Sequence, residues 1–247
     1  MKTYKDISYG NLPEQKLDIY IPDCDNFDLF IYFHGGGIEG GTKETTHFLP
    51  TLIEKGIAVI SADYRLYPTA VYPEFIRDAA AVVAWATQHI EEYGHCKKIF
   101  VGGSSAGGYI SMMLCFDKKY LAPYGIDPLE LGGFIHNSGQ TTVHFNILRE
   151  RGFDSRRVII DEAAPIYHIG TAEKYAPMLF VVADNDIENR YEETQLMIST
   201  IKHFGYDMSK IKYQLMHSGH CQYNSEFDEN GKNLLGNLII EFIDEFK

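Results

Sequence analysis

Short, nearly continuous apolar runs alternate along the chain with longer segments in which apolar residues recur at helical spacing. Continuous runs rich in Ile, Val and Phe are typical of strands that are covered on both faces. They predict strands at residues 16–22, 28–34, 56–62, 97–103, 132–138, 177–184 and 211–217. The helical spacing, together with start and stop residues, predicts helices at 42–55, 73–93, 105–117, 189–204 and 233–246.

This alternation predicts an α/β fold, in which a mainly parallel central sheet carries helices on both faces. The sequence has no repeat and no Pro/Gly/Ser-rich linker, so we expect a single domain over residues 1–247. Ligands of such sheets bind at the carboxyl ends of the strands. Residues 139–165 break the alternation, and we expect them to form a small lid over that edge.

Composition and charge exclude several classes of protein. A formal net charge of −12 disfavours nucleic acid and anionic membranes as partners, because both require clustered Lys and Arg. The longest uninterrupted apolar run, residues 79–86, is too short to span a bilayer, and the first residues do not resemble a signal peptide. We therefore expect a soluble, cytoplasmic protein. Nothing in the sequence indicates an oligomeric state.

The sequence contains neither a metal-binding nor a cofactor-binding pattern. The cysteines are widely separated, which suits reduced thiols better than disulfides or a zinc site. They are Cys24, Cys96, Cys115 and Cys221. There is no HExxH motif, and we predict no metal and no cofactor.

The most informative stretch is GGSSAGG at residues 102–108, between a predicted strand and a predicted helix. Its glycine spacing matches neither the dinucleotide nor the phosphate-loop pattern. It does match GxSxG, with Ser105 at the centre. A serine at a sharp strand-to-helix turn presents its hydroxyl beyond the sheet edge, and small neighbours let strand and helix approach. The pattern therefore predicts that Ser105 is a nucleophile.

A second glycine cluster, HGGG at residues 34–37, follows another predicted strand. Consecutive glycines let neighbouring backbone amides face one point, as an oxyanion requires. We predict that the amides of Gly36 and Gly37, with that of Ala106 at the start of the helix, form an oxyanion hole. For His34 a structural role in holding the turn is the favoured interpretation.

A nucleophilic serine needs a base, and the base needs a carboxylate that orients it. Two histidines follow the last predicted strand, and His220 in the Ser-Gly-His turn is favoured over His217 as the base. Two aspartates end the strand before it, and Asp186 is favoured over Asp184, which suits a turn-bracing role. The order Ser, Asp, His along the chain is that of α/β-hydrolases.

Taken together, these motifs resemble the α/β-hydrolase superfamily and, within it, carboxylesterases of the hormone-sensitive-lipase branch and the BD-FAE-like esterases. The matching segments span almost the whole chain: QKLDIYIP (15–22), HGGG (34–37), DYRLYP (63–68), GGSSAGG (102–108), ADND (183–186) and SGH (218–220). The resemblance implies an α/β-hydrolase fold and catalysis by Ser105, Asp186 and His220. It also implies hydrolysis of small carboxylic esters through an acyl-enzyme. The shortness of the expected lid suggests short acyl groups or an acetylated sugar, and feruloylated sugars are a further candidate.

Two departures from that family limit what can be carried over. The usual GDxSAGG pattern has an acidic residue beside the nucleophile, where this chain has Ser104. The long N-terminal cap of hormone-sensitive-lipase relatives is missing, so a lid would have to come from residues 139–165. Amide or formamide hydrolysis by the same groups is the alternative function, and a non-catalytic binding protein on this scaffold is a weaker one.

Overall fold

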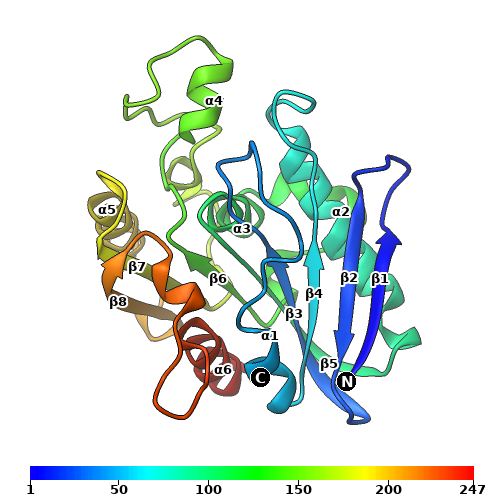
Figure 1. Cartoon of the computed structure of the whole chain (residues 1–247). Helices are drawn as coiled ribbons and strands as arrows, with labels where there is room; N and C mark the ends of the chain where they lie inside the picture. Colours follow the sequence, from blue (N-terminus) through cyan, green and yellow to red (C-terminus); the bar gives the residue numbers. More distant parts are fainter.

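The computed structural model describes every residue from Met1 to Lys247, and its centre is an eight-stranded sheet (Figure 1). The strand order across the sheet is β1-β2-β4-β3-β5-β6-β7-β8. The strands are β1 (Lys2–Ser8), β2 (Lys16–Ile21), β3 (Asn26–Phe33), β4 (Ile57–Ala62), β5 (His95–Ser104), β6 (Gly133–Asn137), β7 (Met178–Asn185) and β8 (Ile211–Gly219). Only the β1–β2 and β2–β4 pairs are antiparallel. From β4 to β8 every neighbouring pair is parallel, which confirms the predicted sheet type.

Helices cover both faces of this sheet. They are α1 (Leu49–Glu54), α2 (Glu74–His89), α3 (Ala106–Phe116), α4 (Phe145–Glu150), α5 (Arg190–His203) and α6 (Leu234–Phe246). Buried residues of α2, α3 and α5 join one hydrophobic cluster, and those of α1 and α6 join a second. Neighbouring residues of β3 alternate between the two, since Leu29 and Ile31 belong to the first and Phe30 to the second. Burial on both faces explains why these strands are continuously apolar.

The sequence did not predict β1, and the structure gives the reason. Six of its seven side chains are exposed, because β1 is an edge strand paired only with β2. Its residues therefore have no apolar run that would mark them as a strand.

The helix predicted at residues 42–55 is wrong in its first half, since α1 begins only at Leu49. The preceding segment instead forms turns that are tied to the sheet through its polar backbone. The amide of Lys43 donates to Asp63 Oδ1 at 2.7 Å, and its carbonyl accepts from Ser61 Oγ at 2.6 Å. Both backbone groups are thereby withdrawn from a helical ladder.

The carboxyl ends of the parallel strands gather the residues that the sequence analysis singled out. His34 directly follows β3, Ser105 follows β5, Asp186 follows β7 and His220 follows β8. Ser138 holds the same position after β6. Because parallel strands all end at the same edge, positions far apart in the sequence meet there.

Residues 139–165 leave the end of β6 and include α4, which stands above the sheet at the top of Figure 1. The first part of the segment is anchored, because Val143, Ile147 and Leu148 are buried in the larger hydrophobic cluster. From Gly152 to Val158 the side chains are mostly exposed. A lid role for this segment remains a prediction.

None of the helices combines the length and apolar character needed to cross a membrane. Nowhere do three or more His, Cys, Asp or Glu side chains come together in a way that could hold a metal ion. The four cysteines form no disulfide.

The close approach of β3 to the start of α3 leads to a prediction about Gly107. A Cβ at this position would lie 1.9 Å from the carbonyl oxygen of Phe33, which is backbone and cannot give way. We expect Gly107→Ala to lower the free energy of unfolding in urea by about 3 kcal/mol or more. Gly40→Ala is the matched control, since its Cβ would meet nothing closer than 3.9 Å. Equal stability of the two variants would contradict this packing.

Candidate active site

Ser105 occupies the turn between β5 and α3, in a backbone conformation that few residues adopt. Its φ of 55° and ψ of −113° lie outside the usual regions for residues other than glycine. The amide of Ser105 donates to the carbonyl of Asn137 at 2.7 Å, which fixes the turn to the end of β6. Neither Gly103 nor Gly107 has room for a Cβ. The sequence therefore folds into the strained strand-turn-helix that its glycine spacing predicts.

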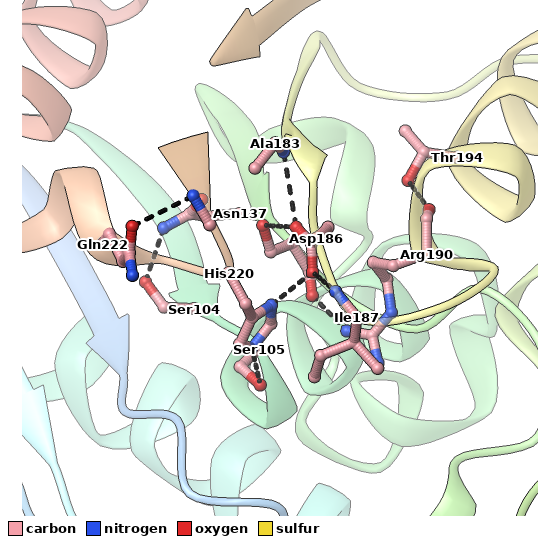
Figure 2. A network of polar contacts seen from close by, with 12 residues as sticks. Ser104, Ser105, Asn137, Ala183, Asp186, Ile187, Arg190, Thr194, His220 and Gln222 are labelled. Carbon is pink, nitrogen blue, oxygen red and sulfur yellow. Dashed lines mark hydrogen bonds and ion pairs between the residues drawn. The ribbon is translucent and has the colours of Figure 1, made fainter. Parts of the chain in front are cut away.

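The imidazole of His220 lies between Ser105 and Asp186 (Figure 2). Ser105 Oγ is 2.9 Å from His220 Nε2, in position to donate its proton to that nitrogen. On the other side of the ring, Nδ1 hydrogen-bonds with Asp186 Oδ1. This fixes the tautomer, because Nδ1 must carry a proton while Nε2 stays free to accept one. The structure thus brings all three predicted side chains into one relay.

Asp186 is a buried carboxylate with several donors. Its side chain has no exposed surface, and besides His220 it accepts hydrogen bonds from Ser138 Oγ at 2.7 Å and from the amide of Ile187 at 2.8 Å. Burial acts to raise the pKa of Asp186, but the His220 pair and the Ser138 hydrogen bond outweigh it and hold the pKa below its usual value. The carboxylate is therefore ionised at neutral pH.

The two residues that the sequence offered as alternatives pair with each other instead. His217 Nδ1 lies 2.6 Å from Asp184 Oδ2, and the His217 side chain is 84% exposed. Neither residue contacts Ser105 or His220. Their pairing at the surface separates them from the relay.

The electrostatics of the relay raise the pKa of His220. Burial of the ring lowers this pKa, but the hydrogen bond with Asp186 and the neighbouring Cys221, when ionised, outweigh the burial and raise it to about 9. The charged imidazolium is thus favoured by its surroundings. At neutral pH the ring is therefore mostly protonated, and the fraction able to accept the serine proton grows as the pH rises toward 9.

The loop after β3 brings unpaired amides to the same place. Gly36 and Gly37 have φ values of 114° and 66°, and their amides donate no hydrogen bond within the protein. A Cβ on Gly35 would lie 3.2 Å from Ser105 Cβ, so the loop passes directly beside the hydroxyl. Ala106 is the first residue of α3, and its amide has no partner inside the helix. All three are positioned to serve as donors.

The buried side chain of His34 stabilises the glycine loop through a hydrogen bond to its backbone and through stacking on Tyr64. It is buried, its ring stacks on Tyr64 at 4.4 Å between ring centres, and Nδ1 donates to the carbonyl of Gly35 at 2.7 Å. The Tyr64 hydroxyl donates to the His34 carbonyl at 2.8 Å. His34 is therefore a packing residue, consistent with the interpretation favoured from the sequence.

An open cleft of about 540 Å³ lies over the relay. Its lining includes Ser105, His220, Cys221, the three glycines of the loop, and side chains that no sequence motif marked, among them Tyr32, Phe145 and Ile187. Phe145 comes from α4, within the segment expected to form a lid. Residues of this kind have no local signature, because only the fold brings them to the cleft.

Sequence reasoning also missed polar residues behind the relay, above all Ser138 and Tyr223. Both are buried, and their hydroxyl oxygens lie 3.0 Å apart. The available signal was the position of Ser138 at the end of a buried strand, between the strands that lead to Ser105 and to Asp186.

Known proteins resemble this chain over part of its length. The family model described as BD-FAE matches residues 17–146, which is more than half of the chain. Kynurenine formamidase of Danio rerio is 28% identical over 54% of this chain and 45% of its own length. Acetyl esterase of Salmonella schwarzengrund is 34% identical over 42% of this chain and 32% of its own length. The matched region thus spans less than half of the length of these curated relatives.

Solved structures show the same fold. A truncated carbohydrate esterase from gut microbiota superposes with a TM-score of 0.77 at 17% identity, over 99% of this chain and 97% of that one. Esterase 2 of Thermogutta terrifontis, phosphonylated by cyclosarin, superposes with a TM-score of 0.74 at 22% identity, over 97% and 92% of the two chains. The predicted α/β-hydrolase fold is confirmed.

The raised pKa of His220 predicts how the reactivity of Ser105 depends on pH. Only a neutral imidazole can accept the serine proton, so phosphonylation of Ser105 by an aryl phosphonate should quicken about tenfold per pH unit and level off near pH 9. The rising part of this pH profile is its acidic limb, and Asp186→Asn should move it to lower pH. The same variant should slow the reaction on the order of 10³- to 10⁴-fold. The rate is read from loss of intact protein by mass spectrometry.

His217→Ala provides the matched control for this experiment. It removes an exposed histidine that also pairs with an aspartate, and it should leave both rate and limb unchanged. His220→Ala should abolish labelling. A wild-type rate that is already constant at pH 7 would contradict the raised pKa.

Proposed function

Because this chain belongs to the BD-FAE family, we propose that it is a serine esterase that hydrolyses small carboxylic esters through an acyl-enzyme. The observation that carries the proposal is the contact of 2.9 Å between Ser105 Oγ and His220 Nε2. The imidazole is oriented on its far side by the buried Asp186 carboxylate. Free backbone amides lie beside the same hydroxyl, where a tetrahedral oxyanion would form.

The proposed reaction begins when His220 Nε2 takes the proton of Ser105 as its oxygen bonds to the ester carbonyl carbon. The negative charge that develops on the carbonyl oxygen is stabilised by the amides of Gly36, Gly37 and Ala106. Asp186 stabilises the imidazolium, which then gives its proton to the departing alcohol as the bond between the acyl carbon and the alkoxy oxygen breaks. Ser105 is left acylated.

Water completes the cycle by the same relay. His220 removes a proton from a water molecule that attacks the acyl carbon, and the oxyanion amides are used a second time. The imidazolium returns the proton to Ser105 as the acyl bond breaks, and the carboxylic acid leaves. The balance requires only ester and water.

The cleft supports small substrates. Its volume of about 540 Å³ and its open shape accommodate a short acyl chain together with a polar alcohol. A relative described as acetyl esterase and a structural neighbour described as carbohydrate esterase point in the same direction. We therefore propose acetyl and other short acyl esters as substrates. Among sugar esters, acetylated or feruloylated sugars are favoured.

Formamide hydrolysis is the second candidate, because a kynurenine formamidase is among the relatives. The same serine, imidazole and amides would act on a formyl carbonyl. The two candidates differ in the leaving group, since an amine must be protonated before it departs and an alkoxide needs this help less. Rates on matched esters and amides therefore separate them.

We expect Ser105→Ala to lower ester hydrolysis at least about 10³-fold, because no nucleophile remains. A serine-directed phosphonate should label the wild-type protein on the peptide that carries Ser105 and should leave the variant unlabelled. Hydrolysis of 4-nitrophenyl acetate and tryptic mass mapping measure the two results. Undiminished hydrolysis by Ser105→Ala would refute the proposal, and the absence of turnover on every ester and formamide tried would favour a binding protein.

We further expect hydrolysis of 4-nitrophenyl esters to decline as the acyl chain lengthens from acetate to decanoate. Acetylated xylo-oligosaccharides should be deacetylated faster than N-formyl aryl amines are deformylated. The comparison uses kcat/KM for each substrate with the same protein preparation. Faster deformylation than deacetylation would assign the formamidase function instead.

A further inference from the structure

A chain of buried polar side chains runs behind the candidate site from the neighbour of the nucleophile to the triad acid. We call Ser104, Asn137, Tyr223 and Ser138 the polar chain. Each of its members is no more than 3% exposed. Asn137 Nδ2 donates to Ser104 Oγ at 2.8 Å, as Figure 2 shows, and the Tyr223 hydroxyl donates to Asn137 Oδ1. Ser138 Oγ lies 3.0 Å from the Tyr223 hydroxyl and 2.7 Å from Asp186 Oδ2.

Ser138 has an unusual backbone that aims its hydroxyl. Its φ is 48°, a left-handed value that serine seldom adopts. Two contacts hold it there: its amide donates to the carbonyl of Val181 at 2.7 Å, and its carbonyl accepts from the buried guanidinium of Arg190. Strain of this kind persists only where the surroundings enforce it, and it is common at functional sites.

The number of protons available in the polar chain decides which group donates in the hydrogen bond between Ser138 and Asp186. Tyr223 has a single hydroxyl proton and two neighbouring acceptors, Asn137 Oδ1 and Ser138 Oγ. Ser138 also has a single proton, for which the choice is between the Tyr223 hydroxyl and the carboxylate of Asp186. A hydrogen bond to a buried carboxylate is roughly twice as strong as one between neutral groups. The proton of Ser138 therefore goes to Asp186 Oδ2.

We propose that Ser138 is a positioning residue for Asp186, supported by Tyr223 through the polar chain. The inference rests on the proposed function, since it assigns these residues a task in the same site. The hydrogen bond from Ser138 acts together with those from the amides of Ala183 and Ile187 to hold the rotation of the carboxylate, so that Oδ1 stays on the imidazole of His220. Ser138 lines no part of the substrate cleft and acts only through Asp186.

The hydrogen bond also affects the charge balance of the relay. It stabilises the Asp186 anion without involving the imidazole. Without it, the carboxylate depends more on the imidazolium, and the protonated form of His220 is favoured further. Removal of the Ser138 hydroxyl should therefore move the acidic limb of the rate to higher pH, while disorder of the carboxylate lowers the plateau.

Ser138→Gly separates positioning from folding. Glycine adopts a positive φ without strain, so this variant should be at least as stable in urea as Ser138→Ala, although neither has the hydroxyl. For both we expect kcat to fall roughly 10- to 100-fold with KM little changed. Tyr223→Phe should act in the same direction but lower kcat only about two- to tenfold.

Tyr175→Phe is the matched control for the tyrosine. It also removes a buried hydroxyl, one that donates to the carbonyl of His168 at 2.8 Å away from the polar chain. It should retain wild-type kcat and the wild-type limb. The pH dependence is measured by hydrolysis of 4-nitrophenyl acetate and, independently of turnover, by phosphonylation of Ser105.

A spectroscopic readout keeps this inference distinct from the proposed function. The proton between His220 Nδ1 and Asp186 should give a downfield proton resonance, and loss of the Ser138 hydroxyl should shift or broaden it even if no ester is hydrolysed. Wild-type kcat, limb and resonance in Ser138→Gly would overturn the inference. So would losses that merely follow the free energy of unfolding across the variants. Absence of ester hydrolysis with an altered resonance would refute only the proposed function.

Discussion

The site depends on two glycines, Gly103 and Gly107, which let the end of β5 and the start of α3 pack directly against the backbone of β3. A Cβ at Gly103 or Gly107 would collide with the carbonyl of Phe33, so strand, turn and helix can meet only because those positions carry no side chain. The turn then holds Ser105 at a positive φ with its hydroxyl outside the sheet. Because β3 runs directly into the glycine loop, the same contact brings the unpaired amides to that hydroxyl. One steric constraint sets the positions of both.

The parallel sheet supplies the remaining geometry. β5, β6, β7 and β8 are consecutive neighbours, and Ser105, Ser138, Asp186 and His220 are the first residues beyond their ends. Neighbouring strands are about 4.8 Å apart, so side chains of successive loops are within reach of one another. The pairing of β7 with β8 shifts register between Ala183 and Asn185, just before Asp186. Asp186 is thus carried out of the ladder toward the imidazole.

This geometry explains which parts of the fold and of the candidate site could be predicted from the sequence and which could not. Glycine spacing and strand ends are local signals, and they predicted Ser105, Asp186 and His220 as well as the sheet that brings them together. β1 escaped prediction because an exposed edge strand has no apolar run. Ser138 escaped because its role comes from partners on β7, α5 and the loop after β8. No residue near it in the sequence indicates a positive φ or a carboxylate 2.7 Å away.

The residue before Ser105 differs from the pattern that this chain resembles. That pattern places an acid there, whereas Ser104 is neutral and accepts hydrogen bonds from Asn137 and Asn224. An acid there would add a second negative charge to the polar chain that ends at Asp186. With a neutral residue, Asp186 is the one carboxylate in contact with His220. The basicity of the imidazole therefore depends on the neighbouring Cys221 and on Asp186, the carboxylate to which Ser138 donates its proton.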